Sequence, residues 1–347
     1  MNGEFNLNYI NKSVEIIKQN QASSGAYIAS PNFSQYKYCW FRDGAFIADS
    51  MNLVNERESA SSFFEWGFKI ILKNKNQIEK ILSKKKENIH LEDLLPTRYT
   101  VEGSSNTGEW TNEQTDGYGT FLWAFEKYSK GNINEEERKA IMYISEYLQK
   151  VWDLPCYDVW EESSEDIHTS TLLSIAAGLK SAEKLLKSKS NWKNILDYII
   201  RKQTKDKRLI KSSSNSGVDG SLVWIGSLYD ILDTEEEIIE NTCEKIYCDL
   251  CFEGGTKRFL EDNYFGGGSW ILLSCYLGKY FKKVGNEKRY FEIKKWVESQ
   301  FQFNGYLPEQ TPEFLLKPDF YKKWVDKWGK IAEPLLWSHA AYIYLMK

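Results

Sequence analysis

Two kinds of apolar segment alternate along the chain. The first kind is amphipathic with a charged outer face, as in residues 135–151, where Ile141, Ile144 and Leu148 recur at helical spacing. The second kind is apolar nearly all round, as in YGTFLWAFEKY and WSHAAYIYLM, which is typical of a buried helix. Between residues 6 and 347 we count twelve such segments, surface-type then buried-type, six times over. The pattern predicts an all-α fold, an (α/α)6 barrel with six inner and six outer helices.

The chain contains no Pro/Gly/Ser-rich linker, so we predict a single domain over residues 1–347. We expect one long surface helix over residues 63–82 and a buried helix over residues 221–232. The polar runs SKKKEN near residue 85 and SSSNSG at 212–217 are expected to be loops.

Each predicted inner helix follows a polar or glycine-rich phrase. These phrases are CWFRDG, EQTDG, WEESSEDIHTS, SGVDG, EDNYFGGGS and AEPLLW. Because strict alternation makes the inner helices parallel, all six phrases should gather on one rim of the barrel. Residues scattered along the chain would then converge in one pocket.

Composition narrows the class of ligand. The net charge of -4 and the pI near 5.7 give no reason to expect a nucleic acid or an anionic membrane as partner. Aromatic residues make up 15% of the chain, with 13 Trp and 21 Tyr, and many lie in polar loops. Aromatic faces beside carboxylates and arginines suit a polyol with apolar C–H faces, which means a sugar.

The N-terminal sequence MNGEFNLNYINKSVEII has no apolar core of a signal peptide, and no run of eighteen apolar residues suggests a membrane span. We therefore expect a cytoplasmic protein that acts on small oligosaccharides.

Metal and cofactor signals are weak. Cys243, Cys248 and Cys251 have the C-x4-C-x2-C spacing of some iron–sulfur proteins, but they read more simply as small apolar side chains on a helix. The histidines lie far apart, without HExxH, and no GxSxG or Walker A motif occurs. We expect neither a metal nor a cofactor.

Three glutamates fall on the predicted rim. Glu161 and Glu162 directly follow Trp160, and Glu309 precedes the last inner helix. A glycosidic bond is hydrolysed by two carboxyl groups, one that protonates the leaving oxygen and one that activates water or attacks carbon. Apolar neighbours such as the Trp160 ring would raise the pKa of the acid. A solvated loop for the first pair and a structural hydrogen bond for Glu309 are the simpler alternatives.

Arg42 and Asp43 follow Trp40 in the first of these phrases. They read as a buried ion pair with Asp43 capping the helix, as a bidentate grip on sugar hydroxyls, or as both. Arg258 and Trp270 flank EDNYFGGG, whose glycines favour a tight turn because no lysine follows to complete a phosphate loop.

These phrases together resemble glycoside hydrolase family 15, the glucoamylase family. The similar elements are WFRDG, GEWTNEQTDGYG, YDVWEE, RFLEDNYFGGGSW and LPEQ with LLWSHA, in the family's order over residues 38–342. The resemblance implies an (α/α)6 barrel that removes glucose from the non-reducing ends of α-glucosides with inversion.

The resemblance also implies roles for single residues. Glu161 would be the general acid and Glu309 the general base, while Arg42 and Asp43 would hold the terminal glucose. Four further positions match residues that line the adjoining pocket: Trp110, Glu162, Arg258 and Trp270. Because the two glutamates precede the third and sixth inner helices, we expect them on opposite sides of the mouth, which suits inversion.

The linkage stays open, since the spacing after WEE differs from the family pattern. We expect action on α-1,4-linked gluco-oligosaccharides, with α-1,6 linkages or the α,α-1,1 linkage of trehalose as alternatives. A non-catalytic sugar-binding regulatory barrel is a further alternative. We do not favour an α/α-barrel enzyme acting on terpenoids or peptides, because the sequence contains neither an aspartate-rich metal motif nor a set of zinc ligands.

Overall fold

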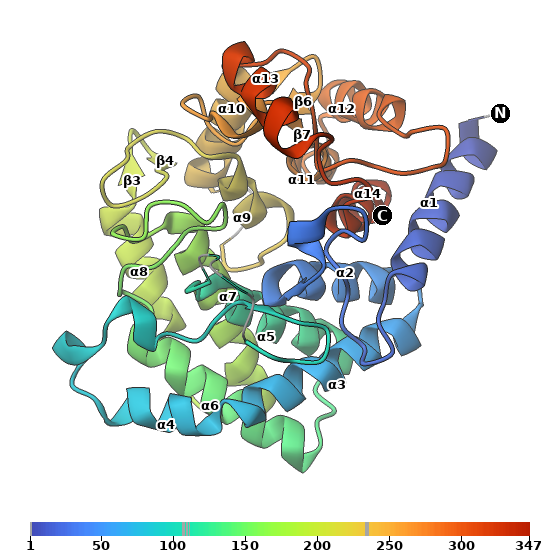
Figure 1. Cartoon of the computed structure of the whole chain (residues 1–347). Helices are drawn as coiled ribbons and strands as arrows, with labels where there is room; N and C mark the ends of the chain where they lie inside the picture. The colour runs from blue at the N-terminus through green and yellow to red at the C-terminus, as the bar shows by residue number, and fades with distance from the viewer. Residues whose placement is uncertain (1, 106–107, 109, 111, 233–235) are drawn as a thin grey trace.

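The structure is a computed structural model that describes residues 2–105, 108, 110, 112–232 and 236–347. Two concentric sets of helices form an (α/α)6 barrel (Figure 1). The inner set is α2 (Phe41–Leu53), α5 (Asp116–Ser129), α7 (Thr169–Leu186), α9 (Trp224–Ser227), α11 (Ile271–Lys283) and α14 (Leu336–Met346). The outer set is α1 (Asn2–Gln19), α3 (Arg57–Lys73), α6 (Glu135–Val151), α8 (Trp192–Lys202), α10 (Glu237–Leu250) and α12 (Glu287–Ser299). The fold class predicted from the alternating segments is confirmed.

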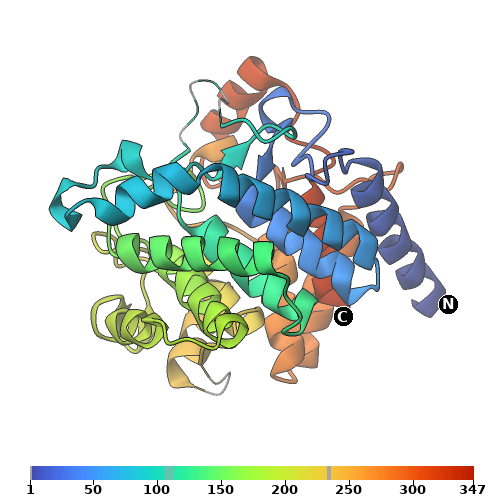
Figure 2. The same cartoon turned by 90° about the horizontal axis from the view of Figure 1, so that it is seen from below.

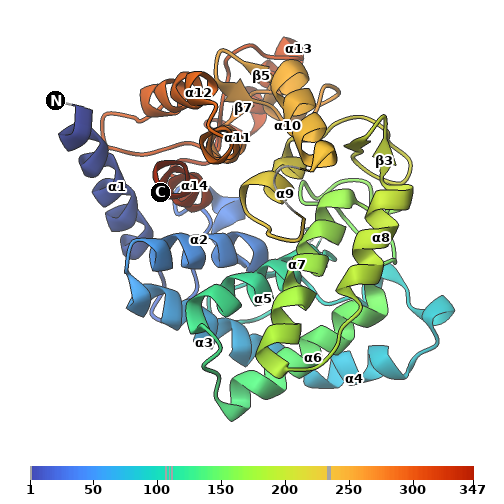
Figure 3. The same ribbon diagram turned by 180° about the vertical axis from the view of Figure 1, so that it is seen from behind.

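Seen from behind, the inner helices surround the centre in chain order, and α14 closes the ring against α2 (Figure 3). The residues of α2, α5, α7, α11 and α14 are almost all buried, because these helices are apolar on every side. Two glycines allow a close approach of neighbours: a Cβ at Gly119 would lie 2.4 Å from Ser174 O, and one at Gly178 would lie 2.3 Å from Gly119 O.

Buried aromatic rings fill the middle of the barrel. The ring of Phe46 stacks on Trp337 with centroids 5.3 Å apart and lies 5.4 Å from Trp224 and 5.8 Å from Tyr276. All four side chains are buried. The barrel interior is therefore a packed core rather than a channel.

The structure differs from the sequence prediction in two helices. The helix expected over residues 63–82 is broken at Asn74 into α3 and α4 (Lys75–Ser83), because the Asn74 side chain donates to Ile70 O (2.9 Å) and ends the first helix. The fourth inner segment is only a 3-10 turn, η4 (Gly220–Val223), followed by the short α9. There the backbone N–H groups of Leu228 and Tyr229 both donate to Trp224 O, which ends the helix.

Figure 2 shows the outer helices α3 and α6 side by side and the additional helix α13 (Pro318–Trp328) near the upper edge. No described helix is long and apolar enough to cross a membrane.

Short paired strands hold the loops that lead into the inner helices. The antiparallel pairs are β1 (Cys39–Trp40) with β2 (Arg98–Tyr99), β3 (Thr204–Lys205) with β4 (Arg208–Leu209), and the sheet β5 (Cys251–Phe252), β6 (Gly255–Thr256), β7 (Ser269–Trp270) and β8 (Gln310–Thr311). In the last sheet Trp270 pairs with Gln310, which places Glu309 beside the start of α11. The remaining 3-10 turns are η1 (Ser34–Tyr36), η2 (Lys86–Asn88), η3 (Leu91–Asp93) and η5 (Tyr264–Gly266).

Candidate active site

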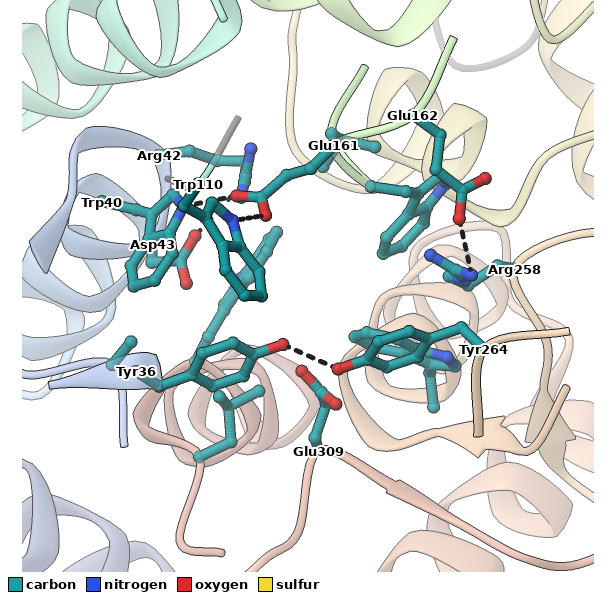
Figure 4. A pocket seen from close by; sticks show the side chains of 16 residues that line it. Tyr36, Trp40, Arg42, Asp43, Trp110, Glu161, Glu162, Arg258, Tyr264 and Glu309 are labelled. Atoms are coloured by element: carbon teal, nitrogen blue, oxygen red, sulfur yellow. Dashed lines mark hydrogen bonds and ion pairs between the residues drawn. The ribbon is translucent and has the colours of Figure 1, made fainter. Parts of the chain in front are cut away.

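A cavity of about 270 Å³ opens at the N-terminal ends of the inner helices (Figure 4). Its lining comes from the loops and first turns of five of the six inner helices. The lining residues are Ala29, Tyr36, Trp40, Arg42, Asp43, Trp110, Val159, Trp160, Glu161, Glu162, Arg258, Tyr264, Trp270, Glu309, Leu335 and Trp337. The ten site residues named from the sequence all lie among them.

Glu161 projects into the cavity from the turn that precedes α7 (Figure 4). Its backbone has a φ of 66°, and its side chain reaches the loops before α2 and α5. Trp40 Nε1 donates to Glu161 Oε1 (2.7 Å), Gln114 Nε2 donates to the same oxygen (3.3 Å), and Trp110 Nε1 donates to Oε2. The carboxyl group is thus held by three N–H donors.

The sequence suggested that the Trp160 ring is an apolar neighbour of the Glu161 carboxyl group, but the hydrogen bonds of this ring go elsewhere. Its Nε1 donates to the carboxylate of Asp219 at 3.1 and 3.0 Å, and its ring lies 5.1 Å from that of Trp270. The indoles that hold Glu161 come instead from other loops and present N–H groups to it, not apolar faces. The Glu161 carboxyl group is thus held by hydrogen bonds from side chains other than Trp160, and the suggested effect of the Trp160 ring on the acid stays a prediction.

Glu309 lies on the other side of the cavity, where its side chain is almost fully buried (Figure 4). Its backbone N–H donates to Ala332 O (2.9 Å), and its own carbonyl accepts from Ile271 N (3.2 Å). Burial raises the pKa of the Glu309 carboxyl to about 7. Among the described residues, Glu309 Oε2 has no hydrogen-bond partner. This buried oxygen is therefore able to accept a bond from a molecule in the cavity.

Two tyrosines face Glu309, and the sequence interpretation did not single them out. The hydroxyls of Tyr36 and Tyr264 lie 2.9 Å apart and point toward the Glu309 carboxylate (Figure 4). Their hydrogen bonds oppose the effect of burial on the pKa of Glu309, as does the charge of Arg258. Tyr264 lies within the quoted EDNYFGGG phrase and Tyr36 in the aromatic run YKYCW, so ring-rich loop segments were the available signal.

Arg42 and Asp43 occupy the first turn of α2 at the base of the cavity. Arg42 Nε lies 3.2 Å from Asp43 Oδ1, and Arg42 Nη1 donates to Gln114 Oε1 (2.7 Å) and Asp116 Oδ2 (3.2 Å). The ion pair expected from the sequence is present and buried. The side chain of Asp43 does not cap the helix, since the N-cap position belongs to Trp40. Burial raises the pKa of Asp43 to about 6, against the effect of Arg42.

Glu162 and Arg258 form the opposite wall. Arg258 Nη2 donates to Glu162 Oε1 (3.1 Å), and the same guanidinium makes two bonds to Asp262 (2.9 and 2.5 Å). The Arg258 guanidinium also lies 5.3 Å from the ring centroid of Trp160 and 5.6 Å from that of Trp270. Planar rings, a guanidinium and a pair of opposed carboxyl groups converge on a small cavity, which is the set of side chains that a glycoside-cleaving site requires.

Comparison with known proteins agrees with this class. Residues 4–301 match the family described as glycosyl hydrolases family 15. The chain is 34% identical over 344 residues to the isomaltose glucohydrolase of Kribbella flavida. The matched stretch covers 95% of this chain and 89% of that relative. The protein therefore belongs to glycoside hydrolase family 15 and is a glycoside hydrolase.

Solved structures give the same result. A wild-type glycosidase superposes with a TM-score of 0.92 at 34% identity, covering 97% of this chain and 95% of the other. A bacterial glucoamylase complexed with acarbose superposes with a TM-score of 0.70 at 16% identity, covering 97% of this chain and 55% of the other, and shows the shared fold.

Proposed function

We propose that the protein is an inverting exo-acting α-glucosidase that releases β-glucose from the non-reducing ends of short α-gluco-oligosaccharides. The observation that carries this proposal is the placement of Glu161 and Glu309, which face each other across a small cavity (Figure 4). An inverting glycosidase needs an acid on one side of the sugar ring and a base with a water on the other.

The surroundings of the two carboxyl groups support their separate roles. The leaving saccharide is larger than water and must lie toward the open side of the cavity. Glu161 is half-buried, whereas Glu309 is nearly fully buried and keeps one unbonded oxygen for a water. We therefore assign the acid to Glu161 and the base to Glu309.

The chemistry of each group is consistent with this assignment. Glu161 gives its proton to the glycosidic oxygen as the C1–O bond breaks, and its three N–H donors stabilise the negative charge that develops on it. Glu309 accepts a proton from the water whose oxygen bonds to C1 on the opposite face. A carboxylate with a pKa of about 7 accepts that proton more readily than an ordinary glutamate.

For the linkage we favour α-1,6 in isomaltose and short isomalto-oligosaccharides. The support is the 34% identity over nearly the whole chain to an isomaltose glucohydrolase. The cavity volume of about 270 Å³ is at the small end of ligand pockets, which suits a short saccharide. The test is glucose release from isomaltose, maltose, trehalose and maltotetraose. Isomaltose should give the highest kcat/KM, and no release from any of the four would overturn the proposal.

The anomer of the product tests the stereochemistry. Opposed carboxyl groups leave room for a water on the far side of the sugar, so the first glucose released from isomaltose should be the β-anomer. NMR spectra recorded before mutarotation should show the β-anomeric proton first. Initial α-glucose would mean a retaining mechanism and would contradict the assignment of Glu309 as a base.

Replacement of Tyr36 by phenylalanine should shift the pH profile. The Tyr36 hydroxyl lowers the pKa of Glu309, so its removal should raise that pKa further. Because the base must be ionised, the acid limb of kcat/KM should move to higher pH. Tyr38→Phe is the matched control, since Tyr38 does not line the cavity. An acid limb that stays in place or moves to lower pH in Tyr36→Phe would count against the role of Glu309.

A further inference from the structure

A buried lysine lies behind the turn that carries Glu161 and does not reach the cavity. The Lys211 side chain is 8% exposed, and its Nζ lies 3.5 Å from Asp219 Oδ2 and 4.0 Å from Asp158 Oδ2. The same ammonium lies 3.1 Å from the centroid of the Phe259 ring. Lys211 is therefore the cation of a buried group with two carboxylates.

Both carboxylates hold the backbone or ring next to Glu161. Asp158 Oδ1 accepts the backbone N–H groups of Trp160 (2.9 Å) and Glu162 (2.8 Å), the residues immediately before and after Glu161. Asp219 accepts the indole N–H of Trp160 with both oxygens. Since Glu161 has a positive φ, its side chain points into the cavity only while this turn keeps its shape.

The charge of Lys211 affects how firmly the turn is held. Burial raises the pKa of Asp158 to about 6, and Asp219 adds to that rise, whereas His168 and Lys211 oppose it. Arg258, which pairs with Glu162, is a further cation near Asp158. An ionised carboxylate accepts backbone N–H bonds more strongly than a protonated one. Without Lys211, Asp158 would be protonated at higher pH and would hold the turn less firmly.

We propose that Lys211 is a positioning residue for proton donation by Glu161, which it serves by pairing with Asp158 and Asp219 beneath the turn. This inference rests on the proposed role of Glu161 as the acid. It assigns no contact between Lys211 and the substrate.

The test compares two substrates in the variant Lys211→Met. Isomaltose needs a proton on its leaving oxygen, whereas α-glucosyl fluoride has a leaving group that departs without one. We expect kcat for isomaltose to fall about 10²-fold and kcat for the fluoride to fall less than about threefold. Equal losses on both substrates would mean that Lys211 only maintains the fold, and no loss on either would also overturn the proposal.

The pH dependence gives a second readout. In Lys211→Met the residual activity on isomaltose should recover partly as the pH is raised, because Asp158 then regains its charge. Lys279→Met is the control, since Lys279 is half-buried and donates to Tyr344 O in α14, and neither residue lines the cavity. It should leave the ratio of the two activities unchanged.

Removal of one charge from a buried ion pair can prevent folding, so a compensated variant is needed. Lys211→Met with Asp219→Asn restores the charge balance and keeps an acceptor for the Trp160 indole. We expect it to fold and to regain about tenfold of the lost isomaltose activity. A folded double variant with no gain would contradict the proposal.

Glu161→Gln measured alongside separates the two hypotheses. If Glu161→Gln itself hydrolyses isomaltose normally, the proposed acid is wrong. If Glu161→Gln does not hydrolyse isomaltose but still hydrolyses α-glucosyl fluoride, while Lys211→Met loses both activities equally, only the role of Lys211 is wrong.

Discussion

Replacement of Glu161 by glutamine should lower kcat for isomaltose by about 10²–10⁴-fold with little change in KM. The amide keeps the shape of the side chain, and its oxygen can still accept the N–H bond from Trp40, but it has no acidic proton to give. Steady-state kinetics of the purified variant will measure the effect.

Glu165→Gln makes the same chemical change on an exposed residue a few positions along the same loop, and both constants should stay at the wild-type level. A kcat for Glu161→Gln close to that of the wild type would end the assignment of this residue as the proton donor.

Replacement of Glu309 by glutamine should lower kcat by a factor similar to that expected for Glu161→Gln. The same replacement should stabilise the protein at high pH. The folded-state pKa of Glu309 is about 7, above its ordinary value of 4.5. Below pH 4.5 the carboxyl group is protonated in both the folded and the unfolded state, so it does not lower the free energy of unfolding. The cost of burying its charge grows between pH 4.5 and 7 and is complete above pH 7.

At pH 8 the glutamine variant should therefore gain about 3 kcal/mol in the free energy of unfolding, or about 4 °C in Tm for a chain of this length. At pH 4 the gain should vanish. Thermal melts of the wild type and the variant at both pH values will check this. A gain of the same size at both would show that the charge of Glu309 is not its cause, and a loss at pH 8 would contradict the burial argument. In this enzyme the catalytic base would then lower the stability of the fold that holds it.

The alternation of surface-type and buried-type segments was enough to predict the ring, because each segment's polarity reflects whether it lies outside or inside. It could not give the length of the fourth inner helix. Residues 221–232 are apolar all round whether they form an α-helix or a 3-10 turn, and the helix ends where the N–H groups of Leu228 and Tyr229 both bond to Trp224 O. The break at Asn74 depends likewise on a local side-chain bond that periodicity does not record.

The site was predictable where the residue type itself carries the chemistry, as with Glu161, Glu309 and Arg42. Their catalytic and binding roles remain predictions. The tyrosines beside Glu309 were not predictable, because a loop tyrosine becomes important only when its hydroxyl points at a particular carboxylate. That depends on η1 and η5 meeting across the cavity, as the contact between Tyr36 and Tyr264 shows.

The aromatic core beneath the cavity has a consequence for the order in which the proposed enzyme would release its products. Because Phe46, Trp224 and Trp337 fill the barrel interior beneath the cavity, a saccharide bound by the proposed enzyme would enter and leave through the mouth that the described residues line. On the proposed exo-acting mechanism the released glucose would lie innermost, behind the shortened saccharide. The shortened saccharide would then have to dissociate after every cleavage, so the enzyme would not degrade a chain processively. Glucose would be the last product to leave and would compete with the next substrate molecule for the innermost position.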